Sequence, residues 1–144
     1  MKITSQNFRN NEKIPVKFTC DGEDINPNLT IEEVPPAAKS LVLIMDDPDA
    51  PAGLWTHWIV WNIYPKTKMI KENEVPEGGT EGKNTSRSLG YQGPCPPRGT
   101  HRYFFRIYAL DCLLNLGVGS ARQELDRTIE GHILEKAELI GLFR

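Results

Sequence analysis

Two histidines stand at the start of strand-like segments, beside rigid turns. His57 and His101 each open a run of apolar residues. A proline-stiffened acidic turn at 46–51 precedes the first run, and a glycine- and proline-rich turn at 93–99 precedes the second. Prolines restrict the backbone of such turns, so a turn of this kind can hold a side chain in one direction. Imidazoles at strand ends beside rigid loops are therefore candidates for ligand contact.

Carboxylates close to the first histidine suggest which chemistry the pair would support. Asp46, Asp47 and Asp49 are crowded around Pro48. A carboxylate beside an imidazole fixes its tautomer and favours the imidazolium, which is a good hydrogen-bond donor to an anion. Two imidazoles, a phenol and the backbone N–H groups of a glycine-rich loop would suit phosphate or a carboxylate. Asp46 itself is more typical of a turn or capping residue.

Strand periodicity predicts which side chains share a face, because successive side chains of a strand alternate between faces. His57, Ile59 and Trp61 fall on one face of the first strand, and His101 and Tyr103 fall on one face of the second. If these two strands are neighbours, both histidines and the tyrosine line one concavity at the end of a sheet.

Structural roles compete with these assignments. A single histidine at a strand end is commonly a hydrogen-bonded structural residue, and a tyrosine at this spacing is commonly at the edge of the core. Cys95 lies near His101 and suggests a Cys–His nucleophile, but no acidic residue nearby in sequence would orient the base. Metal-ligand spacings such as HxxxH or HxH are absent. We therefore predict no metal site and no cofactor.

Composition narrows the class of protein and of partner. The 144 residues fit a single domain spanning 1–144, and the net charge of −2, without a basic stripe, argues against nucleic acid as a partner. No apolar run approaches the roughly 20 residues of a membrane span. The polar amino terminus lacks a secretory apolar region, so we expect a cytoplasmic protein. Cys20, Cys95 and Cys112 show no CxxC spacing and are predicted to be reduced thiols.

The elements that would position these residues are mostly strands. Short apolar runs alternate with proline- and glycine-rich connections, which indicates a mainly β chain. Strands are predicted at 16–19, 41–45, 57–64, 101–110 and 139–143. The 41–45 run is apolar throughout, as in a strand covered on both faces. The long connection 77–99 is predicted to be functional, because loops of that length in a compact domain are usually functional or disordered.

One substantial helix is predicted in the carboxy-terminal half of the chain. Ser120 and Gln123 have the spacing of a capping box at its start. Leu125, Ile129 and Ile133 then recur at helical spacing and would face the core. His132 falls in the middle of this predicted helix and is assigned a structural role.

These motifs resemble the phosphatidylethanolamine-binding protein family, also called the Raf kinase inhibitor protein family, in its bacterial and archaeal branch. The residues that carry the resemblance are the DPDAP block at 47–51, His57–Trp58 with Asn62, the GYxGPxPPxGTHRY block at 90–103 and the EGH segment at 130–132. The resemblance covers nearly the whole chain. It implies a β-sandwich built around a large antiparallel sheet, with a small anion-binding pocket at one end.

Positions that match the family's motifs imply the residues of that pocket. Ligand-binding residues would be Asp47, His57, Pro97, His101 and Tyr103, and supporting residues would be Asp49, Pro51, Tyr91 and Gly93. The resemblance also implies a cis Ala50–Pro51 bond. Prokaryotic members of the family are often dimers, so a homodimer is an expectation here too.

Three functions compete at this point. The first is a non-catalytic protein that binds a small anion, phosphate or phosphoethanolamine-like, and that regulates or inhibits a protein partner. The second is an inhibitor of a serine protease or a kinase in which the pocket is incidental and segment 77–88 makes the contact. The third is a hydrolase that uses the His/Asp site, although no set of nucleophile, base and orienting residue is recognisable.

Overall fold

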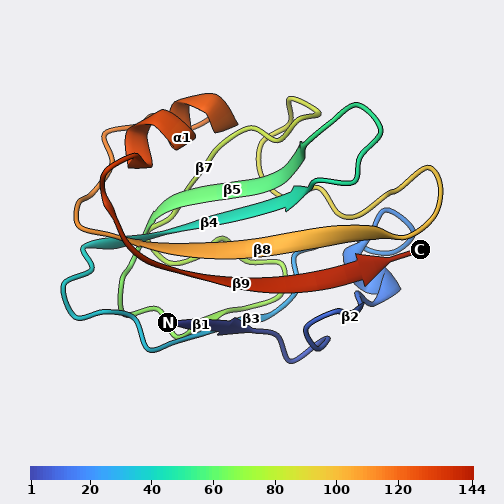
Figure 1. The fold of residues 1–144 in the computed structure, drawn as a ribbon, viewed down its shortest axis with the longest axis horizontal. Helices are drawn as coiled ribbons and strands as arrows, with labels where there is room; N and C mark the ends of the chain where they lie inside the picture. Colours follow the sequence, from blue (N-terminus) through green and yellow to red (C-terminus); the bar gives the residue numbers. More distant parts are fainter.

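The computed structural model describes residues 1–144, which form two β-sheets, one α-helix and one short 3-10 helix (Figure 1). The large sheet has the strand order β2 (Glu12–Lys13), β9 (Ile133–Phe143), β8 (His101–Leu110), β4 (Ser40–Asp47), β5 (Trp55–Ile63) and β7 (Thr80–Glu81). The small sheet has the order β1 (Lys2–Thr4), β3 (Leu29–Glu32) and β6 (Met69–Ile70). The expectation of a mainly β chain with a large, mostly antiparallel sheet is confirmed.

The layers explain why the central strand is apolar throughout. One hydrophobic cluster fills the space between the two sheets, and a second lies between the large sheet and helix α1 (Arg122–Ile129). Strand β4 contributes Leu43 and Met45 to the first cluster and Val42 and Ile44 to the second. Because both faces of β4 are covered, alternation of polar and apolar residues is absent from it.

Helix α1 differs from the predicted helix at both ends. Its amino-terminal cap is Ala121, whose N–H donates to the Glu124 carboxylate, while the Ser120 hydroxyl donates to the Gly117 carbonyl instead of capping. The helix ends at Ile129, and Gly131 then takes a φ of +82°, a conformation that glycine adopts without strain. Leu125 and Ile129 are buried as expected.

Residues beyond that glycine are not helical. Ile133 begins strand β9 and is 43% exposed, so its predicted place in the core is wrong. His132 lies in the turn between α1 and β9, where its ring pairs with Asp111. The helical spacing of Ile133 was misleading because β9 begins there and pairs with β8 along its length.

The amino-terminal region also differs from the prediction. Val16–Phe18 forms a short 3-10 helix, η1, where a strand was expected. Pro15 precedes it, and the Thr19 hydroxyl donates to the Val16 carbonyl at its end. A fixed proline φ followed by a hydroxyl that closes the turn favours this compact conformation over an extended one.

Two of the three cysteines are joined. Cys20 and Cys95 form a disulfide, with their Cα atoms 5.5 Å apart, and Cys112 is free. The prediction of three reduced thiols is therefore wrong, because the chain brings together two cysteines that are 75 residues apart. This bonded pair gives no support to the expected cytoplasmic location, where reduced thiols are usual. No helix of the chain combines the length and apolarity needed to cross a bilayer.

Segment 77–99 is tied to the sheet along much of its length. It contains β7, which pairs with β5, and a bridge between Lys83 and Leu89. The Thr85 hydroxyl accepts from the Thr56 backbone N–H, and the Thr85 N–H donates back to the Thr56 carbonyl. This connection therefore extends the large sheet and supports the beginning of β5.

Candidate functional site

The two histidine strands are not neighbours, yet both histidines reach the same place. Strand β4 lies between β5 and β8 and runs antiparallel to both. The end of β4, at Asp47, therefore meets the starts of β5 and β8 at one edge of the sheet. The ring centroids of His57 and His101 lie 5.3 and 6.5 Å from that of Tyr103. The strands are thus not adjacent, which was the condition set for convergence, yet the three side chains do come together.

A β-bulge directs His57 into this site. Met45 pairs with Trp58 and Asp46 pairs with Thr56, so His57 is the extra residue on β5. An extra residue re-aims a side chain by breaking the alternation of faces. His57 consequently packs edge-on against Tyr103, on the face opposite Ile59 and Trp61. The prediction that these three β5 residues share a face is therefore wrong.

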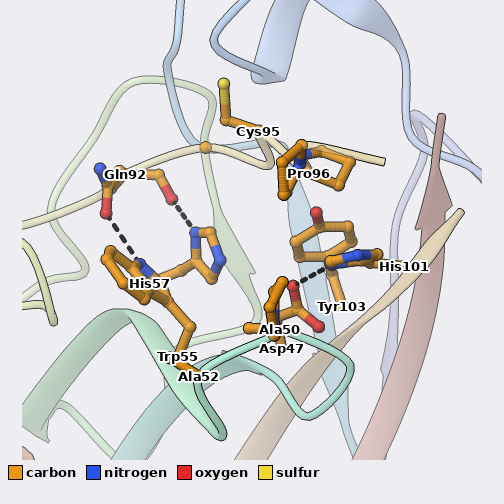
Figure 2. Close-up of a pocket in the computed structure, with 13 residues that line it drawn as sticks. Asp47, Ala50, Ala52, Trp55, His57, Gln92, Cys95, Pro96, His101 and Tyr103 are labelled. Carbon is orange, nitrogen blue, oxygen red and sulfur yellow. Dashed lines mark hydrogen bonds and ion pairs between the residues drawn. The ribbon is translucent and has the colours of Figure 1, made fainter. Parts of the chain in front are cut away.

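A cavity of about 370 Å³ opens between the two imidazoles (Figure 2). All five predicted ligand-binding residues line it, together with the supporting residues Pro51 and Gly93. Asp49 and Tyr91 are not among the lining residues. Sequence reasoning missed six others, namely Ala50, Ala52, Trp55, Gln92, Cys95 and Pro96. Five of them lie in the two proline-rich turns or next to them in sequence, and Trp55 lies two residues before His57, so proximity was the available signal.

His101 is held by a buried carboxylate. Its Nδ1 lies 2.7 Å from Asp47 Oδ2, and the other Asp47 oxygen accepts from the Asp49 backbone N–H at 2.7 Å. Both side chains of the pair are less than a tenth exposed. The carboxylate fixes the hydrogen on Nδ1, and Nε2 of His101 is left without a protein partner. Asp47 thus orients the imidazole of His101, the second histidine along the chain.

His57 is held by a backbone carbonyl on the opposite side of the cavity. Its Nδ1 donates to the Gln92 carbonyl oxygen at 2.6 Å, because a carbonyl can only accept. Burial lowers the pKa of His57 below its ordinary value of 6.5, against the opposing effects of the Gln92 hydrogen bond and of Asp47. The neutral ring therefore has its hydrogen on Nδ1 and an unshared pair on Nε2.

Tyr103 lies beside both imidazoles. Its side chain is fully buried, and its hydroxyl oxygen, which points towards the Cys95–Pro96 segment, has no hydrogen-bond partner (Figure 2). Burial, and next the charge of Asp47, raise the pKa of this phenol well above its usual value. Tyr103 therefore stays protonated and supplies a wall with one unused hydroxyl group.

The wall at 92–97 is anchored to the amino-terminal region. The Gly93 N–H donates to Asp24 Oδ1 at 2.7 Å, and the Tyr91 hydroxyl donates to the Phe18 carbonyl at 2.7 Å. A Cβ on Gly93 would overlap Asp24 Oδ1 and the Phe18 carbonyl, so this glycine is required by close approach. The Cys20–Cys95 disulfide adds a covalent link. Tyr91 thus supports the segment from behind, in agreement with a supporting role.

This anchoring leaves the loop with few donors for a ligand. The Gly93 N–H is already used, and Pro94, Pro96 and Pro97 have no N–H group. The expectation that backbone N–H groups of this loop would hold an anion is therefore wrong for most of the segment. The polar side chains that line the cavity are Asp47, Trp55, His57, Gln92, His101 and Tyr103.

The other wall, at 47–52, is stabilised by Asp49. Its carboxylate accepts from the backbone N–H of Arg102 and, through two further bonds, from the Arg102 guanidinium. These bonds lower the pKa of Asp49 to about 2. The Ala50–Pro51 bond is trans, as are all other peptide bonds of the chain, so the expected cis bond is wrong. Asp49 tethers the turn without touching the cavity.

Asp46 belongs to a separate network on the opposite face of the sheet. It is fully buried and pairs with Arg106 at 2.9 Å and with Arg122 of α1 at 3.0 Å. Arg122 also donates to the Thr56 hydroxyl, next to the bulged residue His57. A structural role for Asp46 agrees with the sequence interpretation.

One further cluster has the composition of a metal site. Atoms of Asp111, Cys112 and His132 that could each bind an ion lie within 4.8 Å of one another, at the opposite end of β8 from His101. Sequence spacing did not indicate this cluster, because His132 comes from a distant segment. His132 Nδ1 is 2.8 Å from Asp111 Oδ1, which reproduces the His101–Asp47 pair at an exposed position.

Comparisons with known proteins agree with the fold and the motifs. The profile of the family described as phosphatidylethanolamine-binding protein matches residues 4–144. A UPF0098 protein of Methanothermobacter thermautotrophicus is 48% identical over 149 residues, covering 100% of this chain and 99% of the relative. A UPF0098 protein of Pyrococcus horikoshii is 50% identical over 151 residues, covering 99% of this chain and 76% of the relative.

Two crystal structures share the architecture. A phosphatidylethanolamine-binding protein homolog from Chlamydia trachomatis has a TM-score of 0.96 and 42% identity, covering 99% of this chain and 96% of that chain. Escherichia coli YbcL, described as a new member of the mammalian family, has a TM-score of 0.92 and 26% identity, covering 99% of this chain and 97% of that chain.

Proposed function

This chain belongs to the phosphatidylethanolamine-binding protein family, and from that premise we propose that it binds a small oxyanion in the cavity between His57 and His101. Phosphate and phosphoethanolamine are the ligands that fit this proposal. One observation carries it: two buried imidazoles, each fixed through Nδ1, have their Nε2 atoms free at one cavity.

The arrangement gives each residue a role in the proposed complex. His101 Nε2 donates to the anion in its imidazolium form, which Asp47 stabilises by accepting from Nδ1. His57 Nε2 contacts the same anion from the other side. Tyr103, Trp55 and Pro97 form walls, and apolar walls suit a ligand whose oxyanion carries an organic substituent.

The proposal is for binding without catalysis. Cys95 is the only cysteine among the lining residues, and its sulfur is bonded to Cys20, so the lining has no thiol. Serine, threonine and lysine are absent from the lining, and Tyr103 is a buried phenol of raised pKa. A covalent mechanism would need a nucleophile in reach of a base, and the imidazoles have none beside them.

A calorimetric titration with phosphoethanolamine tests the proposal. We expect His101→Ala to weaken binding by at least about tenfold, because a charge-assisted hydrogen bond is lost. His132→Ala is the matched control, since it removes the same type of His–Asp pair from the exposed end of β8. Wild-type affinity in His101→Ala, with its fold confirmed by circular dichroism, would refute the proposed site.

Segment 77–88, the candidate contact for a protease or kinase, offers no support for the inhibitor alternative. Its Gly82 N–H donates to the Ile59 carbonyl, and its Lys83 N–H donates to the Ser120 carbonyl. A segment bonded in this way serves the sheet, so oxyanion binding stands as the proposal. Regulation of a protein partner by the occupied cavity is the second half of that proposal, and capture of a partner only in the presence of phosphoethanolamine would test it.

A further inference from the structure

We propose that the cavity selects an oxyanion that still carries a hydroxyl group, such as a phosphate monoester or hydrogen phosphate, and that it discriminates against phosphodiesters. The inference rests on the proposed function and specifies its ligand class. The hydrogen-bond pattern at the two imidazoles and the charge of the lining carry it.

His57 offers a hydrogen-bond acceptor, Nε2, to a ligand in the cavity. The Gln92 carbonyl binds Nδ1–H, so the neutral ring presents an unshared pair at Nε2. His57 is only 5% exposed, and no other protein group donates to Nε2. A ligand oxygen without a hydrogen would be repelled by the unshared electron pair on Nε2, whereas a hydroxyl group of the ligand would donate a hydrogen bond to it.

The lining of the cavity has no excess positive charge. Asp47 is the only carboxylate among the lining residues, and neither lysine nor arginine lines the cavity. With His101 protonated, the Asp47–His101 pair is neutral, and with His101 neutral the pair is negative. Of the nearby cations, Arg102 is paired with Asp49 and Arg144 with Asp21, and Arg98, which follows the lining residue Pro97, is exposed to solvent outside the lining.

The remaining charged groups around the rings strengthen the same conclusion. His57 feels the carboxylates of Asp47, Asp46 and Asp24, and His101 lies near Asp49 as well as Asp47. Tyr103, beside both rings, is neutral. A phosphate dianion would therefore enter surroundings that are acidic on balance, with one strong donor at most.

These two features match one ligand type. A monoester in its monoanionic form donates its P–OH to His57 Nε2 and accepts from His101 Nε2 through an ionised oxygen. Because the second pKa of a phosphate monoester is about 6, binding from solution at pH 7.5 takes up a proton from solvent. A diester has no P–OH, so it leaves the His57 acceptor unsatisfied or requires the buried imidazole to become charged.

Phenyl phosphate and its methyl ester are a suitable pair of probes, because they differ by one methyl group and share an aromatic ring that suits the apolar walls. We expect the monoester to bind about tenfold more tightly at pH 6, where about half of it is already the monoanion, since a buried acceptor left unpaired is costly. At pH 7.5 only about one molecule of the monoester in 30 is the monoanion, which offsets this preference, so the affinities are compared at pH 6 and proton uptake is measured at pH 7.5. Titration calorimetry in buffers of different ionisation enthalpy should also show uptake of about one proton by the monoester.

A variant separates hydrogen bonding from steric exclusion of the extra methyl group. His57→Gln keeps a side chain of comparable length that can donate as well as accept, so the preference for the monoester should fall towards unity. An unchanged preference in this variant would assign the discrimination to size and overturn the inference.

The outcomes also distinguish the inference from the proposed function. Equal affinities of the wild type for both probes, or tighter binding of the methyl ester, would overturn the inference and leave oxyanion binding in place. Failure of both probes and of phosphoethanolamine to bind would overturn both.

Discussion

Removal of the Cys20–Cys95 disulfide should destabilise the protein strongly. The bond joins residues 75 positions apart, so it closes a large loop in the unfolded chain. The chain-entropy relation for a loop of this size gives about 4.5 kcal/mol at 25 °C, and native disulfides typically contribute about 2–4 kcal/mol. We expect a loss of about 3–4 kcal/mol, because the 92–97 wall keeps its hydrogen bonds to Asp24 and to Phe18.

Urea unfolding of the double variant Cys20→Ser/Cys95→Ser measures this loss. Replacing both cysteines avoids a free thiol on the cavity wall. With a urea slope of roughly 2 kcal/mol per molar, the midpoint should fall by about 2 M. Cys112→Ser is the control, since Cys112 is not bonded and its replacement should leave the midpoint nearly unchanged.

A second measurement tests the same bond without mutation. Addition of a phosphine reductant to the wild type should lower the midpoint to that of the double variant and have no effect on the variant itself. If the wild type unfolds at the same urea concentration with and without reductant, the reasoning about this linkage is refuted.

Two further predictions follow from the walls of the cavity. Gly93→Ala should lower the free energy of unfolding by about 1–3 kcal/mol and weaken phosphoethanolamine binding, because the added methyl group overlaps Asp24 and Phe18. Gly117→Ala is the control, since its methyl group meets nothing within 4 Å. Equal urea midpoints for the two variants would contradict the packing argument. Histidine NMR should show His57 titrating below its ordinary pKa of 6.5 with the hydrogen on Nδ1. Because the pKa of His57 is lower in the folded protein than in the unfolded chain, the stabilisation that depends on its neutral ring is complete above pH 6.5 and is lost as the pH falls. An NMR titration midpoint of His57 above pH 6.5 would disprove this.

The strands show how far local sequence patterns reach. The 101–110 strand was predicted with its observed bounds, and 41–45 and 57–64 lie largely within β4 and β5. These predictions succeeded because a run of apolar residues is typical of a buried strand. The predictions at 16–19 and at Ile133 failed because a proline-led turn and a long-range β8–β9 pairing overrode the local pattern.

The residue types of the site were readable for a similar reason. Aspartate, histidine and tyrosine at strand ends beside proline turns are uncommon combinations, and all five residues that the family motifs implied line one cavity. The missed lining residues are mostly alanine, proline and tryptophan. Such residues have ordinary packing roles elsewhere in a chain, so their types alone give no signal of a site.

The sequence by itself thus determined a mainly β chain of this family and the side chains that meet at one end of its sheet. Tertiary structure alone decided which way those side chains face and which atoms they present. The bulge at His57, the Gln92 carbonyl that fixes its tautomer and the Cys20–Cys95 bond all join segments far apart in the chain. Local preferences act over a few residues, whereas a tautomer or a disulfide depends on which distant atom is brought within bonding distance.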